Sequence, residues 1–380
     1  MNTGKMRTSD DIKAVEGVVF LVAMEMSLKT WRLAMAPSGS GKERQVQVPA
    51  GHYAELGEAV AKAKERFGMD KSSRVVLCYE AGREGFHPYR VLSEMGHTAW
   101  IIDSSSIEVN RRARRAKNDA VDASKILTLM QRDYRGEQPL KRVRVPTVEQ
   151  EDYRQGTRER EVLIKERARL RVRIQSLLFS QGIRDLPKSV LGIERWLTTQ
   201  GQRVPTHLRA RIERDVVRLT LTDRQLKDLT KEQHMHCTTK AADVATDPIA
   251  QQLTQLKGIG AIGACILSSE LFGWRHFNNR REVGACVGLT PTPYDSGESS
   301  REQGISKAGN KRIRRVIVEV AWKWLDYQPD SALSRWFMER FGQGKRNRRI
   351  GIVALARKLL VALWHYLKQG VIPNGAQLKA

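Results

Sequence analysis

Four carboxylates stand where apolar segments begin or end, and they are the side chains best suited to phosphoryl chemistry. Glu25 ends a first predicted strand and Glu80 ends an apolar run, whereas Asp119 and Asp122 are three residues apart and share one face of a predicted helix. Carboxylates from several elements can hold two divalent ions about 4 Å apart, which stabilise the attacking and leaving oxygens of a phosphate. We therefore predict that the four residues bind Mg²⁺ in a two-metal site.

Each carboxylate also has a purely structural interpretation. Glu25 could lie in a turn, Glu80 could cap the following helix, and Asp119 and Asp122 could neutralise the basic run from Arg112 to Lys117. A carboxylate beside buried apolar residues is costly unless it is paired or binds a metal ion. The ordered set favours the metal site more than any single member does.

The segments that must position these carboxylates predict an α/β layered domain. Short apolar runs alternate with stretches of helical periodicity, which is typical of a sheet covered by helices. Strands are predicted at 18–36 (a hairpin of two), 45–50, 74–80 and 98–103, and helices at 53–67 and 85–95.

The rest of the chain is predicted to be mostly helical. Residues 148–181 are predicted to form a long helix with a partial heptad seam, and residues 182–246 are predicted to be polar and mostly helical. Residues 253–272 resemble a helix-hairpin-helix, with a turn at Gly258–Gly260 that could approach a phosphate closely. Residues 284–315 are loop-rich and lead into a helix with an apolar face, and a last helix is expected at about 350–367.

The charge of the chain indicates a polyanionic partner. There are 66 Lys and Arg against 42 Asp and Glu, a net charge of +24. Such an excess favours nucleic acid, because neutralising phosphates releases counterions. The alternatives are an anionic lipid surface, for which no amphipathic segment was found, and solubility alone. The basic residues gather in stripes at 111–117, 167–173, 307–315 and 345–349.

Cysteine and histidine give no sign of a metal site or a disulfide framework. Cys78, Cys237, Cys265 and Cys286 lie far apart and form no CxxC pair, so each is predicted to be a small buried hydrophobe. The His234–His236 pair lacks further ligands and is predicted to lie in an exposed loop. No segment reads as a membrane span or a signal peptide, so a cytoplasmic protein associated with the nucleoid is expected.

The motifs together resemble a known family. The order of strand carboxylate, central-strand Glu and K-x-D-x-x-D helix (Lys117–Asp122) is similar to the RuvC-like nuclease fold. With LKGIGAIG at 256–263, FNNRREVGACVGLTP at 277–291, SG at 296–297 and GISKAGNKRIRR at 304–315, the chain resembles the DEDD transposases of the insertion sequence 110 family. The family usually has Asp at its first acidic position, whereas this chain has the longer Glu25.

The resemblance implies that Ser296 is a nucleophile. In that family a serine of the C-terminal domain attacks a DNA phosphate, and the matching position here is Ser296 in the sequence YDSG. A serine hydroxyl needs activation, and no histidine lies within the motif, so metal ions or a carboxylate of another domain would have to supply it. The alternative is a loop serine that makes turn hydrogen bonds, with Ser299, Ser300 and Ser306 nearby.

Basic residues flank both candidate centres and are predicted to hold phosphates, although a solvated helix face is the simpler interpretation. They are Arg111, Arg112, Arg114, Arg115 and Lys117 before the aspartates, and Lys307, Lys311, Arg312, Arg314 and Arg315 after the serine.

The resemblance implies a recombinase that cuts and rejoins DNA to mobilise an insertion sequence, guided by a noncoding bridge RNA. It implies a RuvC-like (RNase H-like) α/β domain at 15–140, a helical coiled-coil assembly arm at 148–245, and a mostly α-helical transposase domain with a helix-hairpin-helix-like segment at 250–370. Donor DNA, target DNA, the RNA and a homodimer or homotetramer are the expected partners. The alternatives are a stand-alone junction nuclease that uses water as the nucleophile, and a nucleic-acid-binding protein without enzymatic activity.

Overall fold

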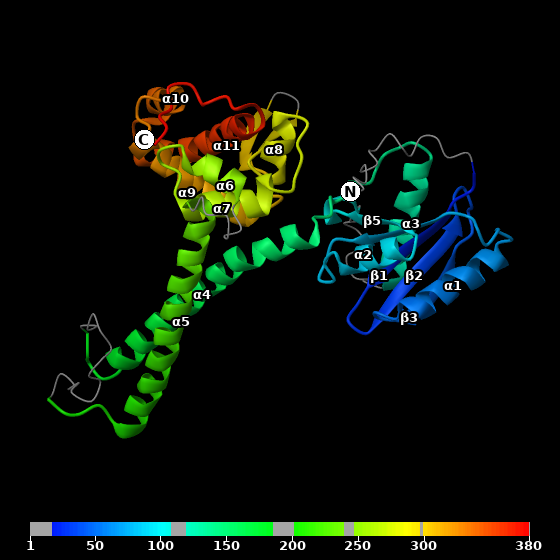
Figure 1. Cartoon of the computed structure of the whole chain (residues 1–380), viewed down its shortest axis with the longest axis horizontal. Helices are drawn as coiled ribbons and strands as arrows, with labels where there is room; N and C mark the ends of the chain where they lie inside the picture. Colours follow the sequence, from blue (N-terminus) through cyan, green and yellow to red (C-terminus); the bar gives the residue numbers. More distant parts are fainter. Residues whose placement is uncertain (1–16, 108–118, 185–200, 239–246, 297–298, 380) are drawn as a thin grey trace. The chain divides into compact units, whose positions relative to one another are not determined.

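A five-stranded sheet organises the first of the two units into which the chain divides, Met1–Pro146 and Thr147–Ala380 (Figure 1). The structure is a computed structural model that describes residues 17–107, 119–184, 201–238, 247–296 and 299–379. The strand order is β3-β2-β1-β4-β5, with β1 parallel to β4 and antiparallel to β2. The strands are β1 (Phe20–Met26), β2 (Thr30–Pro37), β3 (Arg44–Pro49), β4 (Val75–Glu80) and β5 (Thr98–Ile102).

The two faces of the sheet carry side chains of different size. One face presents large residues such as Phe20, Trp31 and Tyr79 to the helices α1 (Tyr53–Arg66) and α2 (His87–Glu94). The other face carries several small residues on its central strands and is covered by α3 (Asp119–Tyr134). The small residues Ala23, Ala34, Ala36 and Cys78 let one helix pack closely against the central strands.

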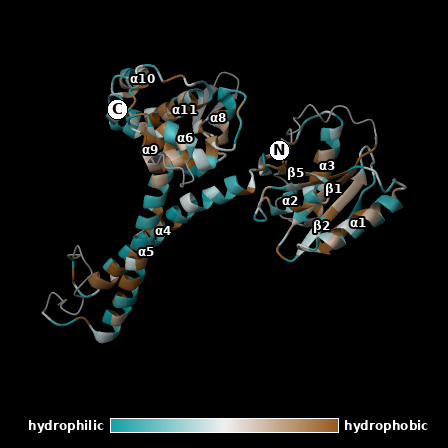
Figure 2. Cartoon of the chain, viewed as in Figure 1, coloured by the Kyte–Doolittle hydropathy of each residue, from teal (hydrophilic) through white to brown (hydrophobic). Residues whose placement is uncertain are grey.

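The second unit begins with two long helices, α4 (Val148–Phe179) and α5 (Thr206–Thr238). They run antiparallel, because Arg160 contacts Thr230 and Arg173 contacts Asp215. Their main shared apolar cluster lies toward the ends farther from the remaining helices, where Figure 2 shows brown residues on the pair. We call this helix pair the arm.

The rest of the second unit is a helical body with one hydrophobic core. Its elements are α6 (Pro248–Thr254), α7 (Ala261–Leu267), a π-helical turn at Ser268–Phe272, α8 (Arg280–Cys286), α9 (Lys311–Tyr327), α10 (Ala332–Phe341) and α11 (Lys345–Gln369). Helix α11 is long and apolar enough in composition to cross a membrane, but it packs Leu355, Leu359 and Leu363 fully buried in this core.

Part of the stretch predicted to be loop-rich forms a β-hairpin. Strand β6 (Pro291–Ser296) pairs antiparallel with β7 (Ser299–Ile305). The sequence prediction missed it because Pro291 and Pro293 lack a backbone N–H and the alternation of apolar residues is weak. Such prolines are tolerated in a two-stranded hairpin, where each strand has a free edge.

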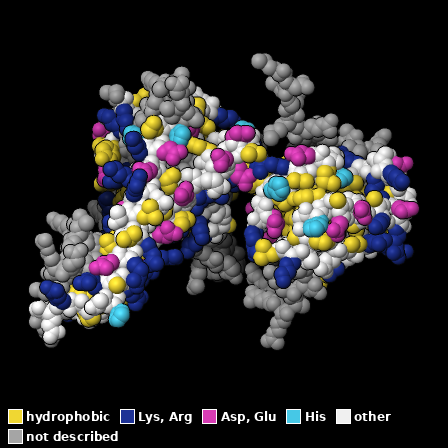
Figure 3. Space-filling view, turned by 60° about the horizontal axis from the view of Figure 1, so that its bottom comes forward, with side chains coloured by type: hydrophobic (Ala, Val, Ile, Leu, Met, Phe, Trp, Pro, Cys, Tyr) yellow, Lys and Arg dark blue, Asp and Glu magenta, His cyan; other side chains and the backbone are white. Residues whose placement is uncertain are grey.

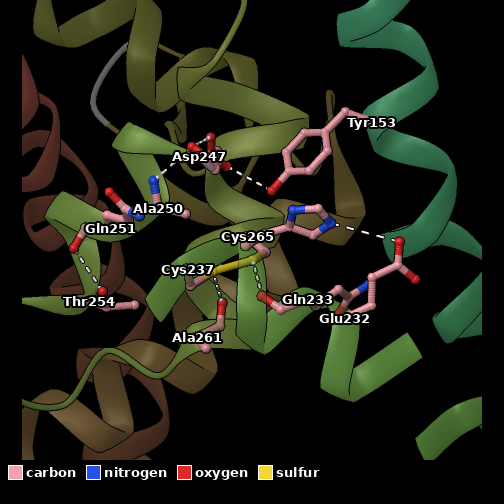
Figure 4. Close-up of a disulfide and its surroundings, with 12 residues drawn as sticks. Tyr153, Glu232, Gln233, Cys237, Asp247, Ala250, Gln251, Thr254, Ala261 and Cys265 are labelled. Atoms are coloured by element: carbon pink, nitrogen blue, oxygen red, sulfur yellow. Dashed lines mark hydrogen bonds and ion pairs between the residues drawn. A yellow bond between two sulfur atoms is a disulfide. The ribbon is translucent and has the colours of Figure 1, made fainter. Parts of the chain in front are cut away.

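Two of the four cysteines are bonded to each other, so the prediction that each is an isolated buried hydrophobe is wrong for them. Cys237 at the end of α5 and Cys265 in α7 form a disulfide (Figure 4). Their 28-residue separation shows no motif, but α5 packs beside α7 in the fold. Cys78 is buried as predicted, and Cys286 is half-buried.

The two histidines lie in a helix, so the prediction of an exposed loop is wrong. His234 and His236 both belong to α5. The His236 ring packs edge-on against Tyr153 of α4 and lies 3.7 Å from Glu232. The Tyr153 hydroxyl in turn donates a hydrogen bond to Asp247, the N-cap of α6 (Figure 4). These contacts fasten the arm to the body.

A network of ion pairs makes a second junction between arm and body. Glu270 in the π-helical turn is 1% exposed, and its carboxylate accepts hydrogen bonds from Arg158 of α4 and Arg312 of α9. Burial raises the pKa of Glu270, but these two guanidinium groups outweigh burial and hold the pKa below its ordinary value. Arg312 also pairs at 2.5 Å with Glu161 of α4, which contacts Arg315 at 3.1 Å.

The junction predicts a pH-dependent stability. Burial raises the pKa of Glu161, but hydrogen bonds from Arg312 and Lys165 lower it more, from 4.5 to about 2. A depressed pKa contributes stability above pH 4.5 that is lost as the pH falls toward 2. We expect Glu161→Gln to lower the free energy of unfolding of the second unit by about 2 kcal/mol at pH 7, measured by denaturant titration, and by progressively less below pH 4.5.

The control is Glu319→Gln, which removes the other carboxylate partner of Arg315, 67% exposed and 3.7 Å away. Its effect should be close to zero, since exposed pairs contribute little. If Glu161→Gln lowered the free energy of unfolding by the same amount at every pH, the ionised Glu161 carboxylate would not be the source of the stability.

Candidate active site

Two of the predicted carboxylates lie on neighbouring parallel strands at the same end of the sheet. Met24 of β1 is in register with Tyr79 of β4, and Glu25 and Glu80 are the next residues on each strand. Alternation along both strands puts them on the face covered by α3, because Ala23 and Cys78 belong to that core. Both residues are half-buried. The structure therefore brings Glu25 and Glu80 side by side in the sheet.

The direction of α3 brings its first turn to the same end. The Gln45 side chain, level with Ala34 and Ala23, donates hydrogen bonds to Ala120 O (3.1 Å) and Ser124 Oγ (2.7 Å). Farther along α3, Gln131 donates to Ser40 O (2.8 Å), which lies beyond the end of β2 that pairs with the start of β1. Helix α3 thus runs opposite to β1, and its N-terminus lies toward the end of β1 that carries Glu25 (Figure 1).

The two aspartates open this helix. Asp119 is its first residue, and its side chain lies outside the described part of the structure. Asp122 is one residue before Ala123, which packs on the sheet, and its side chain is 24% exposed. The Asp122 carboxylate accepts a hydrogen bond from Lys125 at 2.7 Å, so a cation already faces one of its oxygens.

The donor set has the chemistry of a magnesium site. All four predicted ligands are carboxylates, the oxygen donors that Mg²⁺ prefers. Among the side chains that the structure describes, no three His, Cys, Asp or Glu gather closely enough to hold a metal ion by themselves. The residues fit such a site in donor type and in their shared end of the sheet, and Asp119 is the member whose side chain is not described.

Two further polar residues near this edge escaped the sequence prediction. Arg32 on β2 is directly opposite Glu25 in the antiparallel register, which no sequence pattern reveals before the hairpin pairing is known. Asp103 follows β5 just as Glu80 ends β4, and the run TAWIID could have indicated it. Alternation along β5 puts Asp103 on the face opposite to Glu80, because Ile102 is in register with Glu80 and packs under α3.

Ser296 is the last residue of β6, and it is in register with Ser299 of β7. Its side chain and residues 297–298 lie outside the described residues. The base of this hairpin is tightly packed. Gly288 (φ +67°) and Gly309 (φ +96°) lie so close to the backbone of Ala308 and Cys286 that a Cβ would stand 1.9 Å and 2.3 Å from their carbonyl oxygens. The hairpin that carries Ser296 therefore begins and ends at a closely packed junction between α8 and α9.

The predicted phosphate-binding residues fall into different environments. Arg111, Arg112, Arg114, Arg115 and Lys117 lie outside the described residues. Lys307 and Lys311 are exposed beside the hairpin base. Arg312 and Arg315 pair with carboxylates, and Arg314 donates hydrogen bonds to Val287 O and Lys307 O. Arg314 therefore helps to hold the hairpin base together. On the arm too, Figure 3 shows acidic side chains (magenta) among the basic ones (dark blue).

The mixed α/β first unit and mostly helical second unit are consistent with an RNase H-like DNA transposase that carries a DEDD set of carboxylates. A family model described as "Transposase" matches residues 52–181, and one described as "Transposase IS116/IS110/IS902 family" matches residues 250–334. The chain belongs to this family of insertion-sequence transposases and is therefore an enzyme that acts on DNA.

Several relatives carry the same assignment. A putative transposase y4rJ of Sinorhizobium fredii is 39% identical over 96% of this chain and 95% of its own length. The transposase for insertion sequence element IS1328 of Yersinia enterocolitica is 27% identical over 74% of this chain and 80% of its own. The transposase for IS1111A of Coxiella burnetii is 26% identical over 74% of both.

The packing of the hairpin base predicts different effects for two glycine substitutions. Gly288→Ala and Gly304→Ala both place a Cβ on a backbone with positive φ, which costs about 1 kcal/mol. Gly304 has open space around it, whereas Gly288 does not. We expect Gly288→Ala to lower the melting temperature of the second unit by several degrees more than Gly304→Ala does. Equal melting temperatures for the two variants would show that the hairpin base accommodates a Cβ at Gly288, which would contradict the close packing described above.

Proposed function

We propose that this transposase cuts and rejoins DNA through a composite site made of four Mg²⁺-binding carboxylates and a serine nucleophile. The observation that carries the proposal is the placing of Glu25, Glu80 and the first turn of α3 at one end of one sheet face. Bound Mg²⁺ would supply the charge stabilisation that a phosphate needs when it is attacked. Glu25, Glu80, Asp119 and Asp122 are the proposed ligands.

Ser296 is the proposed nucleophile. Its Oγ loses its proton and forms a bond to the phosphorus of a DNA phosphate, while the bond from phosphorus to one deoxyribose oxygen breaks and that oxygen takes up a proton. A covalent serine–DNA link conserves the phosphodiester energy, so a second strand can later displace the serine and rejoin the DNA. The closely packed base of the β6–β7 hairpin supports this role, because a nucleophile must be held in line with its target.

The arm is proposed to join copies of the chain. Residues 148–245 supply a long antiparallel helix pair, and several of its apolar side chains face solvent: Val162, Val172, Val217 and Leu221 are at least half exposed. Two such arms that pack as a coiled coil would cover these residues. A homodimer or homotetramer built in this way would let residues 15–140 of one subunit meet residues 250–370 of another.

The finer parts of the proposal concern nucleic-acid recognition. A noncoding bridge RNA that pairs with donor and target DNA would choose the sequence, so that the protein reads shape and backbone. The helix-hairpin-helix-like segment at 253–272 is proposed to contact backbone phosphates through its turn. Gly258 has a structural reason for its positive φ as well, since a Cβ there would stand 3.2 Å from Lys323 O on α9.

The serine mechanism predicts a covalent intermediate. We expect wild-type protein, incubated with Mg²⁺, DNA of the element ends and the RNA transcribed from its flank, to give a protein–DNA adduct that survives denaturation. Ser296→Ala should abolish both the adduct and strand cleavage, because no other oxygen takes the place of Oγ. Gel mobility of end-labelled DNA after denaturation is the measurement.

The matched control is Ser299→Ala, which removes the serine in register with Ser296 on the neighbouring strand. It should leave adduct formation within a few-fold of wild type. Cleavage that persists in Ser296→Ala without an adduct would instead indicate a nuclease that uses water as the nucleophile.

A further inference from the structure

The basic residues of the C-terminal segment are almost unopposed by acids. From residue 331 to residue 380 the sequence holds one carboxylate side chain, Glu339, against ten cations. The ten are Arg335, Arg340, Lys345, Arg346, Arg348, Arg349, Arg357, Lys358, Lys368 and Lys379. They give this segment a net charge of +9, more than a third of the +24 of the whole chain.

Several basic residues of the arm and of α9 are instead paired with carboxylates. On the arm, Arg167 and Arg171 lie within 4 Å of Asp223, and Arg173 binds Asp215, which is 3% exposed. At the start of α9, Arg312 and Arg315 pair with Glu161. The carboxylate offsets the charge of a cation paired in this way, so the pair attracts a distant phosphate only weakly. Of the ten cations at 331–380, none forms an ion pair with a described residue.

Aromatic rings hold several of these cations in place without cancelling their charge. The ammonium of Lys358 lies 4.6 Å and the guanidinium of Arg340 5.9 Å from the ring centre of Trp336. Arg348 lies 5.8 Å from the ring of Trp322 and 5.6 Å from that of Phe337. A ring quadrupole orders a cation and leaves its full unit charge available, whereas a carboxylate would remove it. The same side chains are therefore both ordered and electrostatically active.

Aromatic rings connect the ring-held cations of α10 and α11. The rings form a chain of contacts from Trp336 to Phe341, Phe337 and Trp322. Arg340 of α10 and Lys358 of α11 lie beside the same ring, Trp336, and Arg348 lies beside Trp322 and Phe337 at the other end of this chain. Lys345, Arg346 and Arg349 are exposed and lie with Arg348 in the first turns of α11.

We propose that six basic residues of α10 and α11, namely Arg340, Lys345, Arg346, Arg348, Arg349 and Lys358, bind the phosphate backbone of duplex DNA. DNA is chosen because the family acts on DNA and because cations without carboxylate partners keep their charge for phosphates. None of these six residues belongs to the hairpin that carries Ser296, and their role does not depend on the serine mechanism.

The test is equilibrium binding of a mixed-sequence DNA duplex by the full chain without Mg²⁺, measured over a series of salt concentrations. The variant Lys345→Gln/Arg346→Gln/Arg349→Gln changes three exposed side chains without ion-pair partners, so its melting temperature should not fall. We expect this variant to bind DNA more weakly than wild type. The slope of log affinity against log salt concentration should become less negative by about three, because each lost cation releases about one counterion fewer on binding.

Two controls make the outcome specific. Lys323→Gln removes an exposed cation of α9 that is already paired with Asp326 at 3.5 Å, and it should leave the slope unchanged. The charge-preserving variant Lys345→Arg/Arg346→Lys/Arg349→Lys should restore the wild-type slope. An unchanged slope for the triple Gln variant would overturn the proposal. A change seen with an RNA duplex and absent with DNA would also overturn it, in favour of an RNA surface. Because no cleavage is measured, failure of the serine mechanism would not affect this result.

Discussion

The packing of α3 on the small-residue face of the sheet is the contact on which the proposed chemistry depends. Ala123, Ile126 and Met130 of α3 are completely buried against residues such as Ala23 and Cys78. Hydrogen bonds from Gln45 and Gln131 hold α3 opposite in direction to β1 on this face, so the helix begins where β1 and β4 end. Glu25 and the first turn of α3, which carries Asp122 97 residues later in the sequence, thereby share one end of the sheet.

The net charge of the protein conceals a division of labour among its basic residues. Arg158, Arg173 and Arg312 are bound by buried carboxylates and hold helices together. Removing one partner of such a pair leaves a buried charge without compensation, which makes these residues structural. Arg340, Arg348 and Lys358 of α10 and α11 lie against aromatic rings and face no described carboxylate at ion-pair distance. Only cations of this second kind add strongly to the attraction for a polyanion.

Local patterns predicted the elements of this protein better than its long-range contacts. The apolar runs that end in Glu25 and Glu80 became adjacent strands, and the helix that begins with Asp119 was expected from its spacing. The direction of α3 depends on hydrogen bonds such as that from Gln45 to Ser124, which no periodicity encodes. The disulfide between Cys237 and Cys265, the hairpin of β6 and β7 and the pairing of Arg312 with Glu270 were missed for the same reason. Each depends on residues that only tertiary packing brings together.

The most direct measurement for the central claim is the binding of Mn²⁺ to the full chain, followed by electron paramagnetic resonance of the free ion. Mn²⁺ prefers the same oxygen ligands as Mg²⁺. The account predicts that Glu25→Gln, Glu80→Gln, Asp119→Asn and Asp122→Asn each weaken binding at least several-fold. Asp103→Asn, at the same edge but on the opposite face of the sheet, should leave binding unchanged. Wild-type affinity in both Glu25→Gln and Glu80→Gln would contradict the account.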